Sequence, residues 1–499
     1  MEKWRIPATT PPGTKAVDVT TSPMNILETV VRHGYCSSCG VCAAVCPHRQ
    51  LQMKETEFGE YNPAATGHCA ESCSLCMEVC PFSNEHCEDE DTLGKELFGS
   101  DANCVHHASM GWVRDSFVGA VADEARRLEA PSGGLTTAVL CHLLKLKQID
   151  AAIVLQPLDE RPWYRFAIVQ SEAQVLDSRG SVYHVAPFDK VISDILAGPD
   201  RSYAVVALPC AAKAFRLAQK RLPALRRRIR YILGLTCSGY RSLLFADLMT
   251  ALMGRSRGVL RYRSKRHARN GLDFRAELKT GHSVRSVKML GLFGYLWTNE
   301  VGILRSCHFC DDVFAELADA TFMDAWLPEY QADRRGTSLV ISRSEDLSRV
   351  LTALFASGEC EGGPIAAKRI EQSQIGVVHR RRDLMAARCQ FAAETLPYVP
   401  KKRLAICPPC SPETDRLLAR RELAFFQAVR NQLPRLHQRI FQRPGWLARW
   451  YAWWLCWKIL LIATRHGFLA KTLSSTKYLL SKFFSSKRNS CTTENEPPT

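Results

Sequence analysis

The chain has 499 residues, of which 46% are hydrophobic and 23% are charged. These fractions exclude intrinsic disorder as the default, and the length suffices for two or three domains. The net charge of +16 does not indicate a nucleic-acid-binding body, because the part from Lys401 to the C-terminus contains 18 Lys or Arg against 5 Asp or Glu. The rest of the chain is close to neutral, and a basic tail more often contacts a membrane or a partner protein than reads bases.

Residues 1–30 are rich in Pro and Thr and are expected to form a flexible leader. Residues 31–85 contain two cysteine runs that repeat one pattern. The first run reads Cys36-Ser-Ser-Cys39-Gly-Val-Cys42-Ala-Ala-Val-Cys46-Pro47. The second reads Cys69-Ala-Glu-Ser-Cys73-Ser-Leu-Cys76-Met-Glu-Val-Cys80-Pro81. The first has the spacing C-x2-C-x2-C-x3-C-P, and the second has one extra residue in its first gap.

Both runs resemble those of bacterial ferredoxins. Three thiolates in one tight turn suit a 4Fe-4S cubane, whereas a tetrahedral zinc ion would need a fourth, distant ligand. In two-cluster ferredoxins the fourth cysteine of each run ligates the other cluster. We therefore expect one 4Fe-4S cluster on Cys36, Cys39, Cys42 and Cys80 and a second on Cys69, Cys73, Cys76 and Cys46. Two zinc knuckles are the alternative, and the Cys-Pro that ends both runs favours the ferredoxin interpretation.

Residues 86–107 follow with an acidic start and are expected to form a solvated linker. The first 35 residues contain no apolar segment typical of a secretory signal. Oxygen-sensitive clusters and free thiols both favour a reducing compartment. We therefore expect a cytoplasmic protein.

Residues 108–345 have a mixed α and β pattern. Short apolar runs predict strands at 151–155, 203–208 and 231–235, and helices are expected at 135–146 and 211–222. Strand, helix and strand at this spacing indicate a βαβ unit with parallel strands. Cys210 and Cys237 directly follow two of these strands, at the edge of the sheet where ligands of open α/β proteins bind.

Further along, Cys307-His308-Phe309-Cys310 forms a lone C-x2-C motif, which alone fits zinc, an iron–sulfur cluster or no metal. With Cys210 and Cys237 it makes four thiols, enough for a third 4Fe-4S cluster. The alternative is that Cys210 and Cys237 are small buried residues.

Three loops are candidate binding segments. Ser132-Gly133-Gly134 precedes a predicted helix, so its backbone N–H groups suit a phosphate or a flavin, or else Ser132 simply caps the helix. The segments 179–183 and 261–265 are either binding loops or solvated faces.

Taken in order, these motifs resemble the family of coenzyme F-420 hydrogenase/dehydrogenase beta subunits over a stretch from about residue 33 to residue 345. The resemblance also includes Gly180-Ser181-Val182-Tyr183, Leu208-Pro209-Cys210, Thr236-Cys237-Ser238-Gly239, Arg263-Ser264-Lys265, Ala318-Asp319, Met323-Asp324-Ala325-Trp326 and Gly336-Thr337-Ser338. The chain departs from the family pattern at Met323, where Gly is more usual, and at Leu75, which replaces a Gly in the second cysteine run.

The resemblance implies an FAD-dependent iron–sulfur oxidoreductase in which electrons pass between clusters and a substrate at the flavin. It makes Cys210, Cys237, Cys307 and Cys310 the expected ligands of a third 4Fe-4S cluster near the flavin. The residues it implies for the flavin site are Ser132, Gly133, Gly134, Gly180, Ser181, Tyr183, Arg263 and Lys265. The family's substrates differ, with a deazaflavin in archaeal hydrogenases and a chlorophyll derivative in plants and cyanobacteria.

The expected fold class is therefore α+β or α/β. A bacterial-ferredoxin-like domain at 31–85 is followed by a mixed α/β flavin and iron–sulfur domain at 108–345 and a basic helical C-terminal part. The expected partners are a small-molecule substrate and an electron donor or acceptor protein, such as a ferredoxin or a reductase, and no nucleic acid. No catalytic side chain is assigned. The alternative function is an electron-transfer adaptor subunit without a substrate of its own.

Residues 346–440 are predicted to form a helical extension, in which residues 379–382 are a charged patch. The remainder, 441–499, is a Trp-rich basic tail. Its Trp446, Trp450, Trp453, Trp454 and Trp457 fall within roughly 100° of one helical face at about 3.6 residues per turn. Arg449 and Lys458 argue against a spanning helix. The tail suits a helix lying on the inner face of a membrane, and packing on the body or on a partner subunit is the alternative.

Overall fold

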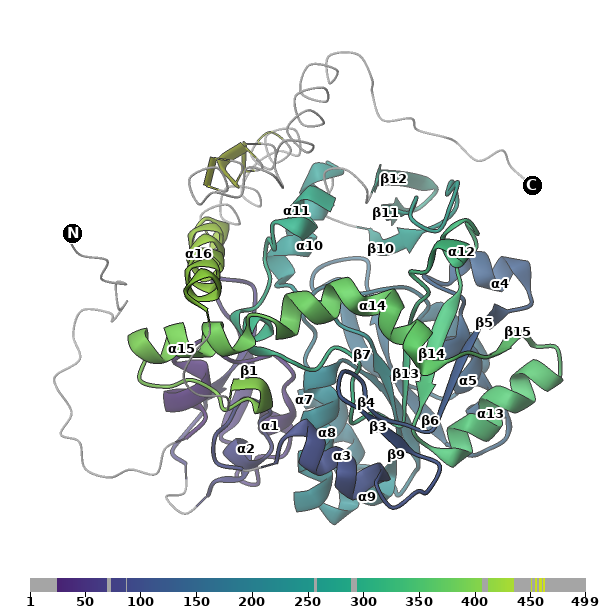
Figure 1. Cartoon of the computed structure of the whole chain (residues 1–499), viewed down its shortest axis with the longest axis horizontal. Helices are drawn as coiled ribbons and strands as arrows, with labels where there is room; N and C mark the ends of the chain where they lie inside the picture. Colours follow the sequence, from purple (N-terminus) through teal and green to yellow (C-terminus); the bar gives the residue numbers. More distant parts are fainter. Residues whose placement is uncertain are drawn as a thin grey trace.

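The computed structural model describes residues 25–69, 73–86, 88–254, 258–288, 294–405 and 412–434, together with 450, 454–455, 457–459 and 461–462. The predicted leader therefore lies outside the described residues up to position 24, as do Trp446, Trp453 and the last 37 residues of the tail, 463–499. Figure 1 shows a small N-terminal module beside a larger α/β body.

The N-terminal module has the same local structure at both cysteine runs. Each run passes through a short helix, because a thiol-bearing turn closes into one helical turn at Cys42 and again at Cys76. Between the runs lies an antiparallel hairpin. The elements are η1 (Leu27–Val31), α1 (Val41–Ala44), β1 (Leu51–Glu55), β2 (Tyr61–Ala65) and α2 (Leu75–Glu78).

The segment after the module leads to the body through α3 (Glu90–Phe98) and a small hairpin, β3 (Val105–His107) and β4 (Gly111–Val113). The body is built on an eight-stranded mixed sheet with the order β15-β5-β14-β13-β9-β8-β6-β7. Strands β6, β8, β9 and β13 are parallel to one another, and the outer pairs are antiparallel. The strand bounds are β5 (Asp115–Val121), β6 (Ala151–Pro157), β7 (Tyr164–Val169), β8 (Tyr203–Ala207), β9 (Ile229–Leu235), β13 (Ala320–Asp324), β14 (Ser338–Ser342) and β15 (Cys360–Pro364).

The three strands predicted from apolar runs are confirmed as β6, β8 and β9, and they are parallel as expected. The two predicted helices are also present, as α5 (Leu135–Lys145) and α8 (Pro209–Arg221). Pro209 opens α8 because its missing N–H is not needed in the first turn. Cys210 and Cys237 therefore lie just past the ends of β8 and β9.

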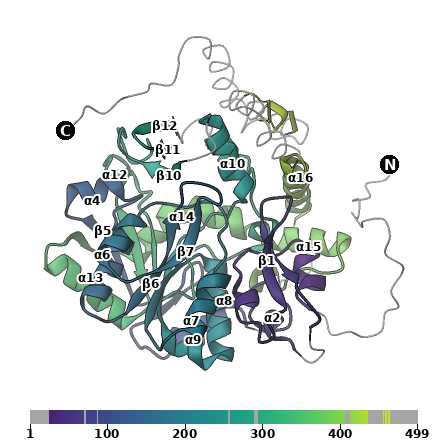
Figure 2. The same ribbon diagram turned by 180° about the vertical axis from the view of Figure 1, so that it is seen from behind.

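Helices cover both faces of the sheet because side chains alternate along each strand. Ile153 and Val205 point to the face covered by α7 (Asp189–Ala197), α8 and α9 (Pro223–Arg228), which also packs against the N-terminal module. Ala152 and Ala204 point to the face covered by α5 and α13 (Glu345–Ala356), beside which lies α6 (Glu172–Asp177). Figure 2 shows α7, α8 and α9 next to the module.

A three-stranded antiparallel sheet forms a separate apolar cluster with α10 (Leu243–Leu252). Its strands are β10 (Val259–Ser264), β11 (Arg275–Thr280) and β12 (Ser283–Lys288). The remaining elements of this half are α4 (Glu124–Glu129), α11 (Gly294–Thr298), η3 (Arg305–Phe309) and α12 (Pro328–Gln331).

The predicted helical extension is helical except for β15, which pairs with β5 as the edge of the large sheet. The sequence hides this strand because Gly362, Gly363 and Pro364 have low strand propensity. Glycine is required at 362, since a Cβ there would lie 2.1 Å from the Val118 carbonyl oxygen. The helices of the extension are α14 (Ala367–Arg382), α15 (Met385–Thr395), η4 (Arg403–Ala405) and α16 (Glu413–Arg430).

Hydrogen bonds fix the N-terminal module on the body and on this extension. The Phe188 N–H donates to the Cys39 carbonyl at 2.8 Å, and the Leu243 N–H donates to the Gly59 carbonyl at 2.7 Å. The Tyr398 hydroxyl donates to the Phe82 carbonyl at 2.7 Å, and Arg430 pairs with Glu60. The backbone of the first cysteine run is thus held directly by the start of α7.

The described part of the Trp-rich tail packs on the body. Leu455 and Ile459 are fully buried in the apolar cluster that contains Phe425 and Val429, whereas Trp450 is 55% exposed. Within the residues that the structure describes, no helix has both the length and the apolar character needed to cross a membrane.

Candidate functional site

The structure brings the cysteines of the two N-terminal runs together in crossed groups. Group 1 denotes Cys36, Cys39, Cys42 and Cys80, and group 2 denotes Cys69, Cys73, Cys76 and Cys46. Burial raises the pKa of the Cys42 thiol, and the other three thiols of group 1 raise it further. Burial and the other three thiols of group 2 raise the pKa of Cys76 in the same way. The fourth cysteine of each run thus lies with the first three of the other run.

The four thiols of the body form a third group, group 3, composed of Cys210, Cys237, Cys307 and Cys310. All four line one small cavity with Phe82 and Tyr240. Burial and the other three thiols of this group raise the pKa of Cys210. Cys39 of group 1 raises it as well, so groups 1 and 3 are neighbours.

Backbone N–H groups point at the sulfur atoms of groups 1, 2 and 3. The Ser38 N–H lies 3.4 Å from Cys36 Sγ, and the Gln50 N–H lies 3.3 Å from Cys46 Sγ. In group 3, the Gly239 N–H lies 3.3 Å from Cys237 Sγ and the Tyr240 N–H 3.2 Å from Cys307 Sγ. Such donors stabilise thiolates, and hydrogen bonds to sulfur are typical of iron–sulfur sites.

No set of three or more His, Cys, Asp or Glu side chains among the described residues is arranged to hold a single metal ion. A cubane requires a different arrangement, because each of its four thiolates binds a different iron atom. The buried thiols, their grouping in fours and their N–H donors fit a cluster of that kind.

A cavity of about 600 Å³ opens between the carboxyl ends of the parallel strands and α14. Cys39, Cys210 and Cys237 lie in its wall, so thiols of groups 1 and 3 border the same space. Six of the eight predicted flavin residues also line it, namely Ser132, Gly134, Gly180, Ser181, Tyr183 and Arg263. The volume falls within the range of cofactor and ligand pockets.

The other two predicted flavin residues, Gly133 and Lys265, lie behind this wall and hold the loop 131–134 in place. The Gly133 N–H donates to the Ser338 hydroxyl at 2.9 Å. The Lys265 ammonium donates to the carbonyl oxygens of Ser132 at 2.6 Å and Arg127 at 3.1 Å. Burial, with the nearby Arg263 charge, lowers the pKa of Lys265 to about 7. Both residues support the loop and do not face the cavity.

Arg263 and Tyr183 form a polar and aromatic part of the wall. Arg263 is buried, pairs with Asp324, and lies 4.7 Å from the centre of the Phe274 ring. Asp324 is the acidic residue that follows Met323, so the family's usual Gly-Asp position here provides the partner of Arg263. The Tyr183 ring packs edge-on against Trp297 at 4.7 Å.

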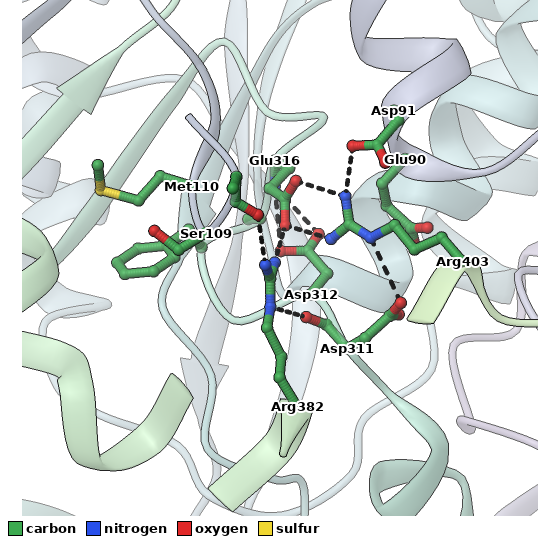
Figure 3. Close-up of polar contacts among 12 residues, drawn as sticks. Glu90, Asp91, Ser109, Met110, Asp311, Asp312, Glu316, Arg382 and Arg403 are labelled. Atoms are coloured by element: carbon green, nitrogen blue, oxygen red, sulfur yellow. Dashed lines mark hydrogen bonds and ion pairs between the residues drawn. The ribbon is translucent and has the colours of Figure 1, made fainter. Parts of the chain in front are cut away.

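A buried network of carboxylates and guanidinium groups lies beside Cys310, as Figure 3 shows. Glu316 is 2% exposed and accepts from Arg382 at 2.6 Å and from Arg403 at 2.5 and 2.8 Å. Arg403 also contacts Asp311 at 3.3 Å and Asp91 at 2.8 Å. The network ties α3, the loop after Cys310, the end of α14 and η4 to one another.

The sequence interpretation missed the part that α14 plays in the site. Gln374, Val377 and Arg380 line the cavity. Their spacing of three residues places them on one helical face, which is the signal that would have indicated it. The predicted charged patch at 379–382 is instead largely internal, because Arg381 is 3% exposed and Arg382 joins the network.

Comparison with known proteins identifies the family. Two family models, described as the N-terminal and the C-terminal parts of the coenzyme F420 hydrogenase/dehydrogenase beta subunit, match residues 116–193 and 200–368. The chain belongs to this family. Helices α15 and α16 and most of α14 lie beyond the matched residues.

Two relatives accompany the family match. The F-type subunit of the F(420)H(2) dehydrogenase of Methanosarcina mazei is 26% identical over 223 residues, which are 43% of this chain and 56% of that protein. The chain thus spans about half the length of this curated relative. A chain of the F420-reducing NiFe hydrogenase complex from Methanosarcina barkeri is 18% identical, with a TM-score of 0.47, over 60% of this chain and 99% of that one.

The packing of Gly133 leads to a prediction for Gly133→Ala. A Cβ at this position would lie 2.6 Å from the Gly119 carbonyl oxygen and 2.7 Å from the Ser338 backbone nitrogen, so the loop must move. We expect a lower midpoint of anaerobic thermal unfolding, equivalent to about 1–3 kcal/mol of overpacking. Gly376→Ala is the matched control, because nothing lies within 4 Å of its new Cβ. Equal midpoints for the two variants would contradict the assignment of Gly133 as a packing residue.

A second prediction concerns the buried network. Arg403→Met leaves the carboxylates of Glu316 and Asp311 without this partner in a buried site, which should cost about 3–5 kcal/mol of stability. Arg349→Met removes an exposed pair with Asp346 and should cost about 0–1 kcal/mol. The anaerobic unfolding midpoint checks both variants, and a fall no larger for Arg403→Met than for Arg349→Met would contradict the role of the network.

Proposed function

We propose that the protein is an FAD-dependent iron–sulfur oxidoreductase that moves electrons between ferredoxin-type 4Fe-4S clusters and a small-molecule substrate at the flavin. The observation that carries this proposal is the shared cavity. Cys39 and Cys210 from two cysteine groups lie in the same wall as Ser132, Gly134 and Tyr183, which the family resemblance implies for flavin binding.

A flavin exchanges two electrons with a substrate and a 4Fe-4S cluster exchanges one, so the pair divides a two-electron reaction into single-electron steps. The residues of the chain supply binding, orientation and exclusion of water. Lys265 and Ser338 fix the loop 131–134, and the pair of Arg263 with Asp324 fixes the opposite wall. The N–H groups of Gly239 and Tyr240 stabilise the thiolates of Cys237 and Cys307.

The positions of the three groups support a proposed route for electrons. Cys69 of group 2 is exposed, which suits exchange with an external donor or acceptor protein such as a ferredoxin or a reductase. Group 1 lies between it and group 3, since Cys42 neighbours Cys76 and Cys39 neighbours Cys210. The proposed order is therefore group 2, group 1, group 3 and the cavity.

The second candidate is an electron-transfer adaptor subunit without its own substrate. It is favoured by the name of the Methanosarcina mazei relative, which describes one subunit of a dehydrogenase. Reoxidation of the reduced protein by small acceptors, compared with reoxidation by a ferredoxin, separates the two functions. Turnover with proteins alone would support the adaptor.

We also propose a cytoplasmic location with peripheral contact at the inner face of the membrane. Trp450 and Trp454 are exposed on the described part of the tail, and the Lys458 ammonium lies 4.8 Å from the centre of the Trp454 ring. Tryptophan and Lys at one surface suit a membrane with anionic lipids. Equal binding of the parent and a Trp450→Ser, Trp454→Ser variant to anionic vesicles would contradict this contact.

The proposed function predicts the content of the protein purified without air. The parent should contain about twelve irons per chain and bound FAD. Cys310→Ala should lose about four irons and keep the flavin, because Cys310 belongs to group 3 alone. Cys141→Ser is the control, since Cys141 lies in α5 outside all three groups and its replacement should leave the iron content unchanged. A parent that contains zinc in place of iron and no flavin would contradict the proposal.

A further inference from the structure

Two arginines, Arg241 and Arg381, are buried beside group 3, with exposed fractions of 1% and 3%. Arg241 follows Cys237 in the loop that leads to α10, and Arg381 belongs to the last turn of α14. Arg381 lies beyond residue 368, where the family match ends. It is therefore a feature of this chain's own extension.

The hydrogen bonds of both guanidinium groups go to neutral acceptors. Arg381 donates to the Cys307 carbonyl at 2.9 Å and to the Ser238 carbonyl. Arg241 donates to the carbonyl oxygens of Gly239 at 3.2 Å and Trp297 at 3.1 Å, and its guanidinium lies 3.4 Å from a Trp297 ring centre. In the part of the chain that the structure describes, neither arginine makes an ion pair with a carboxylate.

The surrounding charges do not balance the two arginines. Glu300 is the carboxylate that acts on both, but its closest charged contact is His308 at 3.5 Å. Burial lowers the pKa of His308 to about 3, so this imidazole is neutral at pH 7. Arg380 adds a third positive charge near Glu300. A buried cation without a counter-charge is costly, so an anion is expected between these arginines and the thiols.

We propose that Arg241 and Arg381 are the counter-charges of the cluster in group 3 and hold its reduction potential above those of the two clusters in the N-terminal module. This inference rests on the proposed function. A 4Fe-4S cluster with four thiolate ligands is anionic, and one electron taken from a donor protein makes it more negative. Nearby fixed positive charge therefore favours the reduced form.

Group 1 has the opposite environment. The carboxylate of Glu60 is among the groups that raise the pKa of Cys36, so it disfavours negative charge there, although Arg430 pairs with Glu60 at the far side of the module contact. An electron should therefore move from group 1 to group 3, and group 3 borders the cavity. The arginines would keep electrons next to the substrate and away from the exposed Cys69.

The test is an anaerobic redox titration of the full chain followed by electron paramagnetic resonance, which reports each cluster separately from activity. At the potential where half of the group 3 cluster is reduced in the parent, Arg381→Gln should lower the ratio of reduced to oxidised cluster at least tenfold, which is 59 mV for one electron. Glu300→Gln removes the opposing charge and should raise the ratio. Arg349→Gln, an exposed arginine, should leave it unchanged.

A group 3 signal that keeps the parental potential in both Arg381→Gln and Glu300→Gln would overturn the inference and leave the proposed function intact. A parent without a third signal and without flavin would overturn the proposed function itself. If Arg381→Gln loses only the group 3 signal, Arg381→Lys decides the matter. Return of the signal at the parental potential supports the counter-charge, and continued loss contradicts it.

Discussion

The parallel arrangement of β8 and β9 is the constraint on which the candidate site depends. Parallel neighbours end at the same edge of a sheet, so Cys210 and Cys237 meet there although 26 residues separate them in the chain. The η3 segment brings Cys307 and Cys310 to the same edge. If these strands were antiparallel, the two thiols would lie at opposite ends of the sheet, and no group of four would form.

The C-terminal extension completes what the sheet begins. Helix α14 lies across the middle of the view in Figure 1 and contributes Arg380 to the cavity, Arg381 to group 3 and Arg382 to the network around Glu316. Arg403 and Tyr398 then hold the following segment against the body and the N-terminal module. A segment outside the family match thus encloses the thiols, and enclosure in a medium of low dielectric strengthens every charge in the site.

Sequence reasoning predicts well what short-range patterns encode. The cysteine spacings group the thiols as the structure does, and the apolar runs locate β6, β8 and β9, because a buried parallel strand is apolar on both faces. It fails where distant contacts decide. Strand β15 is stabilised by its neighbour β5 in spite of its glycines, and Lys265 is directed behind the cavity wall by three carbonyl groups from separate segments. Neither arrangement leaves a local signal.

The most direct test of the account is X-ray diffraction from crystals of protein purified without air, with data collected on both sides of the iron absorption edge. The account predicts three separate sites of anomalous scattering from iron, one within each cysteine group, and flavin density in the cavity beside Cys39 and Cys210. Iron at groups 1 and 2 alone, with no iron among Cys210, Cys237, Cys307 and Cys310 and no flavin in the cavity, would contradict it.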